Sequence, residues 1–346
     1  MRLGVISMIR NEADIVRAFS DHLAAFFDVA YLLDHRSADG TGELLQRAAA
    51  ARNGWKYTRL EFSGYHQKEV SNFFMKKAFE EASVDFLFFL DADEFLSVPT
   101  RAELVDYLSH NLSRKALGKC SWRNCCPVDF TRIKFCLGDE VWMASNTSSF
   151  SKMIIPREVY AAFGHRLQVL QGNHGIEPLG EELPLVETCD LFHMPVRSFH
   201  QMTQKVVVGA LSYLSKGGRL STDGYHWFEL LDRIAAGKID EGSLIHLVAN
   251  YGQPLGAEEA RSFEELGELG FQRRLLQVAS ASIPKDLADP ARDANGLQLI
   301  AASIREWSNE DARLGRLVLE GEEIRLLPAV ASLPPLNLVE NMSVPR

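Results

Sequence analysis

The chain has 346 residues, of which 46% are hydrophobic and 24% charged, a profile typical of a globular protein with one large domain or two smaller ones. Its net charge is −9 and its lysines and arginines are scattered, which argues against a nucleic-acid groove, because such a groove needs clustered cations. Five cysteines without paired C-x-x-C spacing indicate neither a disulfide framework nor a zinc site, and they favour a reducing cytoplasm.

The first residues predict a strand and no export signal. Residues 1–8 read MRLGVISM, without the basic start, apolar core and cleavage site of a signal peptide. No segment approaches the roughly 20 apolar residues that a membrane helix needs. We therefore expect a cytoplasmic protein, and any membrane contact would have to be peripheral, at the inner face.

Strands and helices are predicted to alternate through the first 110 residues. Apolar runs predict strands over 1–8, 29–33, 55–62 and 86–90, and helical spacing predicts helices over 15–27, 41–48, 67–82 and after residue 100. Asn11 is expected to cap the first helix, Thr41 is a plausible cap of the second, and Thr100 forms a capping box with Glu103. This alternation is typical of an α/β protein with a mostly parallel sheet flanked by helices.

Two carboxylates follow the most apolar run of the chain. The strand FLFFL ends at Leu90 and leads directly to Asp91 and Asp93, at the edge where α/β sheets bind ligands. Paired carboxylates suit Mg²⁺, which completes its shell with water and substrate phosphate. The spacing thus predicts a metal site for a phosphate-bearing substrate. The alternative is that these acids only cap a helix or solvate a loop.

Three ordered blocks carry a resemblance. The segments IRNEAD at 9–14, LDHRSADGT at 33–41 and FLDADEF at 89–95 resemble family 2-type glycosyltransferases with the GT-A (Rossmann-like) fold. They are most similar to a bacterial subgroup with (K/R)NE and D-x-D-E-F motifs. Looser similarity continues at 151–156, 164–165 and 191–198. The resemblance implies a nucleotide-sugar-binding catalytic domain over 1–205, followed by a mainly helical accessory region over 206–346.

The resemblance also implies a donor site. Asp34 would hold the base or ribose of the nucleotide. Asp91 and Asp93 would bind Mn²⁺ or Mg²⁺, with ribose contact as the alternative for Asp91, and His193 would be an extra metal ligand. Glu94, next in an extended segment, would point away from Asp93 and support the site. The other residues assigned to the nucleotide or its diphosphate are Arg10, Asn11, Glu12, Gln67, Lys152 and Arg197, with Lys205 as a further cation.

Several of these assignments have a plain structural alternative. Asp39 is either in the site or an ordinary Asp-Gly turn residue. Gln67, with Lys68 and Asn72 behind it, is either near the nucleotide or on a polar helix face. Lone histidines are more often structural, which applies to His193 and, more strongly, to His165 and His174. Lys152 and Arg197 are equally plausible as solvated surface charges.

The function implied by the resemblance is metal-dependent transfer of a sugar, by default from a UDP-sugar, to a glycan or lipid-linked acceptor in polysaccharide synthesis. Inversion needs a carboxylate base. Asp129 and Glu177 are the candidate bases, and Asp139 and Glu140 form only the reverse of the usual Glu-Asp pair. A non-catalytic nucleotide-sugar-binding or scaffold domain is the alternative, ahead of a haloacid-dehalogenase-type phosphatase and a nucleotidyltransferase.

Residues 206–346 lack a recognisable motif. Gly217-Gly218 and Asp223-Gly224 interrupt a helical pattern, and residues 317–327 predict a short hairpin around Gly321. The tail from Pro328 is expected to be extended or disordered. The sequence therefore predicts function mainly from its first two hundred residues.

Overall fold

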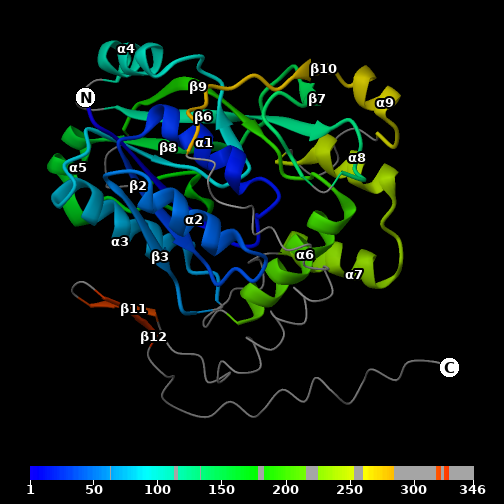
Figure 1. Cartoon of the computed structure of the whole chain (residues 1–346), viewed down its shortest axis with the longest axis horizontal. Helices are drawn as coiled ribbons and strands as arrows, with labels where there is room; N and C mark the ends of the chain where they lie inside the picture. Colours follow the sequence, from blue (N-terminus) through cyan, green and yellow to red (C-terminus); the bar gives the residue numbers. More distant parts are fainter. Residues whose placement is uncertain are drawn as a thin grey trace.

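A mixed ten-stranded sheet is the centre of the molecule (Figure 1). The computed structural model describes residues 1–62, 64–112, 116–132, 134–177, 183–215, 225–252, 260–283, 317–320 and 323–326. Within them the strand order is β10-β7-β6-β8-β4-β1-β2-β3, and β9 pairs with β6 and with β5. The predicted α/β class, with helices flanking the sheet, is confirmed. No described helix is long and apolar enough to cross a membrane.

Strands and helices alternate through the first 111 residues, as the sequence predicts, except that the short strand β5 follows β4 directly. The strands are β1 (Leu3–Ile9), β2 (Val29–Asp34), β3 (Trp55–Arg59), β4 (Phe86–Phe89), β5 (Glu94–Leu96), β6 (Leu117–Pro127), β7 (Glu140–Ala144), β8 (Ser151–Pro156), β9 (Leu185–His193), β10 (Phe271–Leu275), β11 (Leu317–Glu320) and β12 (Glu323–Leu326). The helices are α1 (Val16–Phe26), α2 (Thr41–Ala50), α3 (Gln67–Glu80), α4 (Arg101–Asn111), α5 (Arg157–Phe163), α6 (Phe199–Leu214), α7 (Tyr225–Ala235), α8 (Glu241–Asn250) and α9 (Phe263–Glu268), with short 3₁₀ turns η1 (Gly164–Arg166) and η2 (Gln171–Asn173).

The parallel half of the sheet contains a point where the strand order reverses. Strands β3, β2, β1 and β4 are parallel to one another, with β1 in the middle, and β8 continues the sheet antiparallel to β4. The chain moves from β1 to β2 and β3 on one side and then to β4 on the other. In sheets with such a reversal, ligands bind at the carboxyl ends of the strands on either side of it, which here are β1 and β4.

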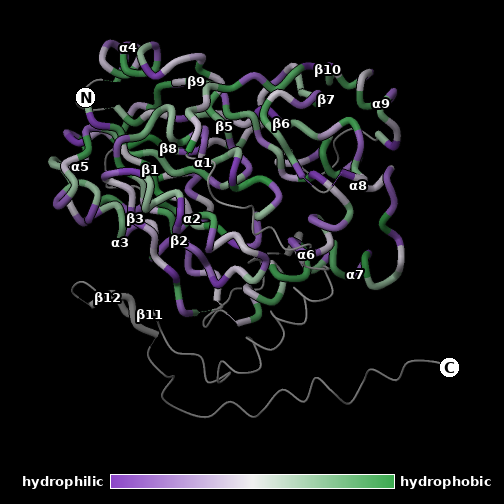
Figure 2. The backbone as a smooth tube through the Cα atoms, in the orientation of Figure 1, coloured by the Kyte–Doolittle hydropathy of each residue, from purple (hydrophilic) through white to green (hydrophobic). Residues whose placement is uncertain are grey.

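The core lies on both faces of this sheet. Leu3 and Val5 of β1 pack against α1 and α2 on one face, while Ile6 packs against α3 and α5 on the other. In β4, Phe88 faces the first group and Phe89 the second, because successive side chains of a strand point to opposite faces. Hydrophobic residues gather where sheet and helices meet (Figure 2). This double burial explains why β4 is apolar throughout.

A third apolar cluster joins the later helices to the sheet. It contains buried residues of α6, α8 and α9 together with Cys126 and Phe130. The predicted helical region is thus present in the described part as α6 to α9. Strand β10, which the sequence did not predict, pairs with β7, and β11 and β12 form the predicted hairpin. The expected breaks at 217–218 and 223–224 and the tail lie outside the described residues. The predicted domain boundary falls inside α6 and stays a prediction.

Two of the predicted helix caps are wrong and one is confirmed. Helix α1 begins at Val16, and Asn11 instead adopts a φ of 54°, a left-handed conformation that asparagine tolerates. Its backbone N donates to Ser37 Oγ and its Oδ1 accepts from the Ala38 N, so it ties the loops after β1 and β2 together. Gly40, not Thr41, precedes α2. Thr100 caps α4 as predicted.

His22 of α1 joins three parts of the chain inside the core. Its Nε2 accepts from the Leu96 N at 2.9 Å, so its Nδ1 carries the proton and donates to the Ala279 O at 2.8 Å. Burial lowers the pKa of His22 to about 4. The ring is therefore neutral in the folded protein at neutral pH.

Acidification is expected to destabilise the protein through His22. In the unfolded chain this imidazole binds a proton near pH 6.5, whereas the folded state resists protonation down to about pH 4. Folding stability is then lost as the pH falls through this window, by roughly 2–3 kcal/mol between pH 7 and 4.5. Urea unfolding at several pH values would measure the loss. His22→Gln should show a shallower pH slope than the wild type, and parallel slopes would refute the assignment.

Candidate active site

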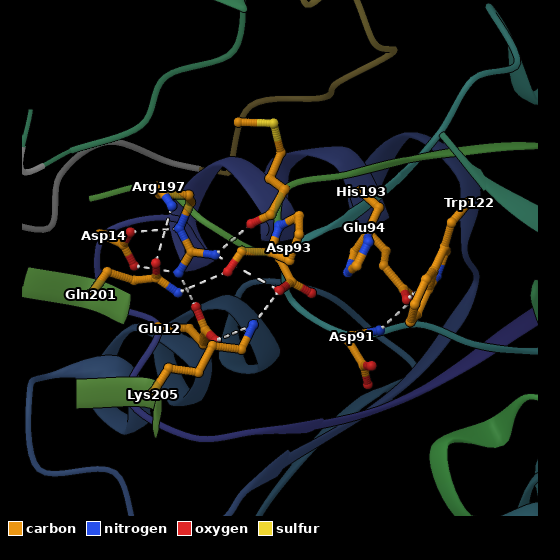
Figure 3. A network of polar contacts seen from close by, with 12 residues as sticks. Glu12, Asp14, Asp91, Asp93, Glu94, Trp122, His193, Arg197, Gln201 and Lys205 are labelled. Carbon is orange, nitrogen blue, oxygen red and sulfur yellow. Dashed lines mark hydrogen bonds and ion pairs between the residues drawn. The ribbon is translucent and has the colours of Figure 1, made fainter. Parts of the chain in front are cut away.

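Five carboxylates and three cations meet at the carboxyl ends of β1 and β4. Figure 3 labels the carboxylates and two of the cations, Arg197 and Lys205. We call this group the ion cluster; its members are Glu12, Asp14, Asp91, Asp93, Glu94, Lys152, Arg197 and Lys205. Two acids follow β1, three lie after β4 and at the start of β5, Lys152 is in β8, and the remaining cations lie before and within α6. The reversal of strand order brings these segments together.

Asp93 is the buried centre of one half of the ion cluster. Lys205 Nζ lies 2.6 Å from Asp93 Oδ2, and Arg197 Nη1 lies 3.8 Å from the same oxygen. Burial by itself would raise the pKa of Asp93, but Lys205, His193 and Arg197 hold it well below its usual value. The Asp93 carbonyl also accepts from the Met194 N at 2.8 Å. Asp93 is therefore a charged carboxylate fixed by both its side chain and its backbone.

Arg197 links the start of α6 to the loop after β1. Its guanidinium contacts both carboxylate oxygens of Asp14, at 2.6 and 3.0 Å, and it also donates to Glu12. The Arg197 backbone N donates to Gln201 Oε1 at 3.0 Å (Figure 3). Burial raises the pKa of Glu12 to about 7, against the opposing effect of Arg197. This half of the ion cluster thus spans residues far apart in sequence.

Lys152 is the centre of the other half. It is only 1% exposed, and its Nζ lies 2.6 Å from Asp91 Oδ2 and 3.5 Å from Glu94 Oε1. Glu94 also accepts from Trp122 Nε1 at 2.7 Å and from the Asp91 N at 3.0 Å. Burial raises the pKa of Glu94 to about 8. Glu94 points toward Trp122 and supports the backbone of Asp91, consistent with strand alternation (Figure 3).

His193 lies beside Glu94 with a defined ring orientation. The two residues pair across β5 and β9, and the His193 ring stacks on Trp122 with centroids 4.0 Å apart. Asn124 Nδ2 donates to the Tyr251 carbonyl, so its Oδ1 accepts from His193 Nδ1 at 3.1 Å. Burial lowers the pKa of His193 to about 3. Its Nε2 is therefore the ring atom with a free lone pair, the form in which imidazole binds metals.

The ion cluster fits a divalent cation by charge and donor chemistry. When every group is ionised, five carboxylates against three cations leave two negative charges. Carboxylate oxygens suit both Mn²⁺ and Mg²⁺, and a neutral imidazole suits a transition metal such as Mn²⁺ better than Mg²⁺. In the described part of the chain, however, no three His, Cys, Asp or Glu side chains are arranged around one point as a metal site. Asp91 and Asp93 instead each hold a lysine.

Of the residues assigned to the nucleotide, Gln67 lies against the ion cluster, whereas Asp34 has its contacts away from it. Gln67 contacts the ion cluster, with Nε2 3.4 Å from Asp91 Oδ1, and Arg10 donates to Ser212 of α6. Asp34 is completely buried: its carboxylate accepts from the Ser37 N at 2.8 Å and from Tyr57 Oη at 3.0 Å. A residue larger than glycine at position 42 would meet Asp34 Oδ2 at 2.4 Å. Asp34 thus has a structural contact set that the sequence did not predict.

The candidate bases have their contacts elsewhere. Asp129 accepts hydrogen bonds from Thr131 on an exposed loop, and Glu177 pairs with Lys68 at 2.9 Å. Asp39 accepts from the Thr41 N within its own turn and from the Ala13 N in the loop after β1. The Asn72 side chain hydrogen-bonds with the backbone N and O of Val169, and the Asp139 carboxylate accepts from the Cys136 N. None of these contacts reaches the ion cluster.

Sequence reasoning missed the residues of β6 that support the site. Trp122 and Asn124 hold Glu94 and His193, respectively, and neither was singled out. Their spacing of two on a strand places them on one face, which is the signal that could have found them. Without the pairing of β6 with β9, nothing in the sequence relates that face to Asp93.

Comparisons with known proteins give only distant similarities. No family model and no curated protein matches the chain. It is 14% identical to TarS of S. aureus over 72% of this chain and 49% of that one, about half its length, with a TM-score of 0.36. It is 15% identical to the mannosyltransferase PcManGT of Pyrobaculum calidifontis, in complex with GDP-Man and Mn²⁺, over 89% and 88% of the two chains, with a TM-score of 0.34. Similarities at this level identify neither a family nor an activity.

Proposed function

We propose that this protein is a metal-dependent glycosyltransferase that moves a sugar from a nucleotide-diphosphate donor to a glycan or lipid-linked acceptor. The observation that carries the proposal is the ion cluster at the carboxyl ends of β1 and β4, built on the paired carboxylates Asp91 and Asp93. This is where a sheet of this strand order binds ligands. The three-block resemblance supports sugar transfer as the reaction, with UDP as the default nucleotide and inversion as the expected outcome.

The roles of the residues follow from their contacts. Asp91 and Asp93, with His193 beside them, would hold Mn²⁺ or Mg²⁺, which would stabilise the charge that develops on the diphosphate as the sugar leaves. Lys152, Lys205 and Arg197 already lie against these carboxylates, so they are placed to bind an incoming diphosphate. Arg10, Asn11, Glu12, Asp34 and Gln67 would shape the nucleotide side. Asp129 and Glu177 remain the candidate bases.

One class of nucleotide sugar is expected to stabilise the protein, and only with the metal. At a ligand concentration of 100 times Kd the gain is about 2.7 kcal/mol, which raises the melting temperature by several degrees. A thermal-shift panel of UDP, GDP, dTDP and CDP sugars, each with Mn²⁺ or with EDTA, measures it. No shift from any donor with folded protein would overturn the proposal.

Turnover separates an enzyme from a non-catalytic binding domain. The donor that stabilises the protein is incubated with Mn²⁺ and glycan acceptors, and release of the nucleoside diphosphate is followed. An enzyme releases it faster with an acceptor than without one. Donor binding without release under any of these conditions would favour the binding-domain alternative.

A further inference from the structure

The turn η2 is linked to the ion cluster through the backbone of a single residue, Gly172. The Gly172 N donates to Gln67 Oε1 at 2.9 Å, and the Gly172 O accepts from Lys152 Nζ at 2.8 Å. Gln67 and Lys152 in turn contact the two carboxylate oxygens of Asp91, at 3.4 and 2.6 Å. Gly172 is therefore connected to Asp91 by two routes, one through Gln67 and one through Lys152.

The turn is held in a conformation that few residues adopt. Gly172 has a φ of 80° and Asn173 a φ of 59°, both in the left-handed region. A Cβ at Gly172 would lie 2.4 Å from the His174 ring, so only glycine fits there. His174 Nδ1 pairs with the Ser151 O at 2.9 Å, and its ring packs edge-on against Trp122. The backbone that carries Gln171 and Asn173 is thus fixed relative to Asp91.

Three buried amide atoms on this turn have no hydrogen-bond partner among the described residues. They are Nε2 and Oε1 of Gln171 and Oδ1 of Asn173, which is 4% exposed. Leaving a buried polar atom unpaired costs roughly 1–3 kcal/mol, and native proteins pair the great majority of them. Unpaired amides on a constrained turn, next to a proposed donor site, indicate groups prepared for a ligand.

The chemistry of the amides indicates which part of a ligand they meet. A diphosphate or a carboxylate would need cations, and neither Gln171 nor Asn173 carries one. The cations proposed to bind the diphosphate, Lys152, Arg197 and Lys205, lie against Asp91, Asp14 and Asp93. A neutral amide offers one acceptor and one donor group, which matches the hydroxyl groups of a sugar. Building on the proposed function, we infer that Gln171 and Asn173 hydrogen-bond the hydroxyls of the donor sugar and contribute to its selection.

The test compares a nucleoside diphosphate with its sugar conjugate. Titration calorimetry with Mn²⁺ measures Kd for both ligands, and their ratio isolates the contribution of the sugar. Gln171→Met keeps the length of the side chain, and Asn173→Gly tolerates the left-handed backbone. Each is expected to weaken binding of the sugar nucleotide about fivefold, the effect of one hydrogen bond, and to leave binding of the diphosphate unchanged. Gln168→Met is the matched control, because Gln168 already donates to the His165 O.

Stability without ligand provides a second readout. An amide that only holds the turn together would lower the melting temperature when replaced, whereas an unpaired one leaves it unchanged or raises it. The inference would be overturned if both variants lost affinity equally for the nucleoside diphosphate and for the sugar nucleotide, or if the ratio of the two Kd values stayed unchanged in both. Variants that bind the donor normally but have a raised KM for the acceptor would also overturn it, since the amides would then bind the acceptor. Failure of the wild type to bind any nucleoside diphosphate would instead overturn the proposed function.

Discussion

Replacing Asp93 by asparagine is expected to abolish metal-dependent donor binding and to lower sugar transfer at least a hundredfold. The carboxylate is the proposed metal ligand and the buried partner of Lys205, 2.6 Å away. Its removal also leaves Lys205 and Arg197 with less compensating charge, so unfolding free energy should fall by roughly 3–5 kcal/mol. Thermal shift with donor and Mn²⁺ and urea unfolding without ligand measure the two effects separately.

A second substitution separates stability from function. In Asp93→Asn/Lys205→Met the uncompensated ammonium is gone, so much of the lost stability should return while donor binding stays absent. Asp85→Asn is the surface control: Asp85 is about 43% exposed and lies 3.8 Å from Arg157, so its loss should cost about 1 kcal/mol or less. Full donor binding by the Asp93→Asn variant would contradict the assignment.

Lys152→Met is the other change with a large expected effect. The buried ammonium lies between Asp91, which is 34% exposed, and Glu94, which is fully buried, so without it Glu94 remains in the interior without a cation. We expect a loss of roughly 3–5 kcal/mol in unfolding free energy, measured by urea denaturation. Lys119→Met removes a lysine of the neighbouring strand β6 that is 33% exposed and 2.8 Å from Glu187, and it should cost about 1 kcal/mol or less.

The same variant has an internal check. Adding Glu94→Gln removes the uncompensated carboxylate and keeps an acceptor for Trp122 Nε1, so part of the stability should return. Equal losses in Lys152→Met and Lys119→Met would show that Lys152 is not the cation that neutralises this half of the ion cluster.

The fold of the first hundred residues could be predicted because local signals and tertiary structure agree there. Strand β4 is apolar on both faces and ends before Asp91, as a buried parallel strand should. The Thr100 cap was also readable, since its partner is three residues away. Asn11 was not, because its hydrogen bonds go to a second loop rather than to its own helix.

The candidate site was predictable only in part. Asp91 and Asp93 stand at a strand end, so their place at the sheet edge follows from the sequence. The choice of Lys205 and Arg197 as partners of Asp93 depends on how α6 packs, and that contact joins residues with no local relation. For Asp34, the sequence correctly placed the residue at the end of β2. Its hydrogen bond with Tyr57 could not be predicted, because it depends on how β3 packs beside β2.

The Asp93–Lys205 contact joins residues 112 positions apart, which has a consequence for synthesis of the chain. The strands β1 to β4 and all five carboxylates of the ion cluster leave the ribosome before Lys152, Arg197 and Lys205 do. Until α6 is made, those acids have too few cations and must stay hydrated or take up protons. The ion cluster is therefore completed late, after the sheet that positions it. A nascent chain ending before residue 197 would contain the whole D-x-D motif and still lack two of the three cations of the ion cluster, Arg197 and Lys205.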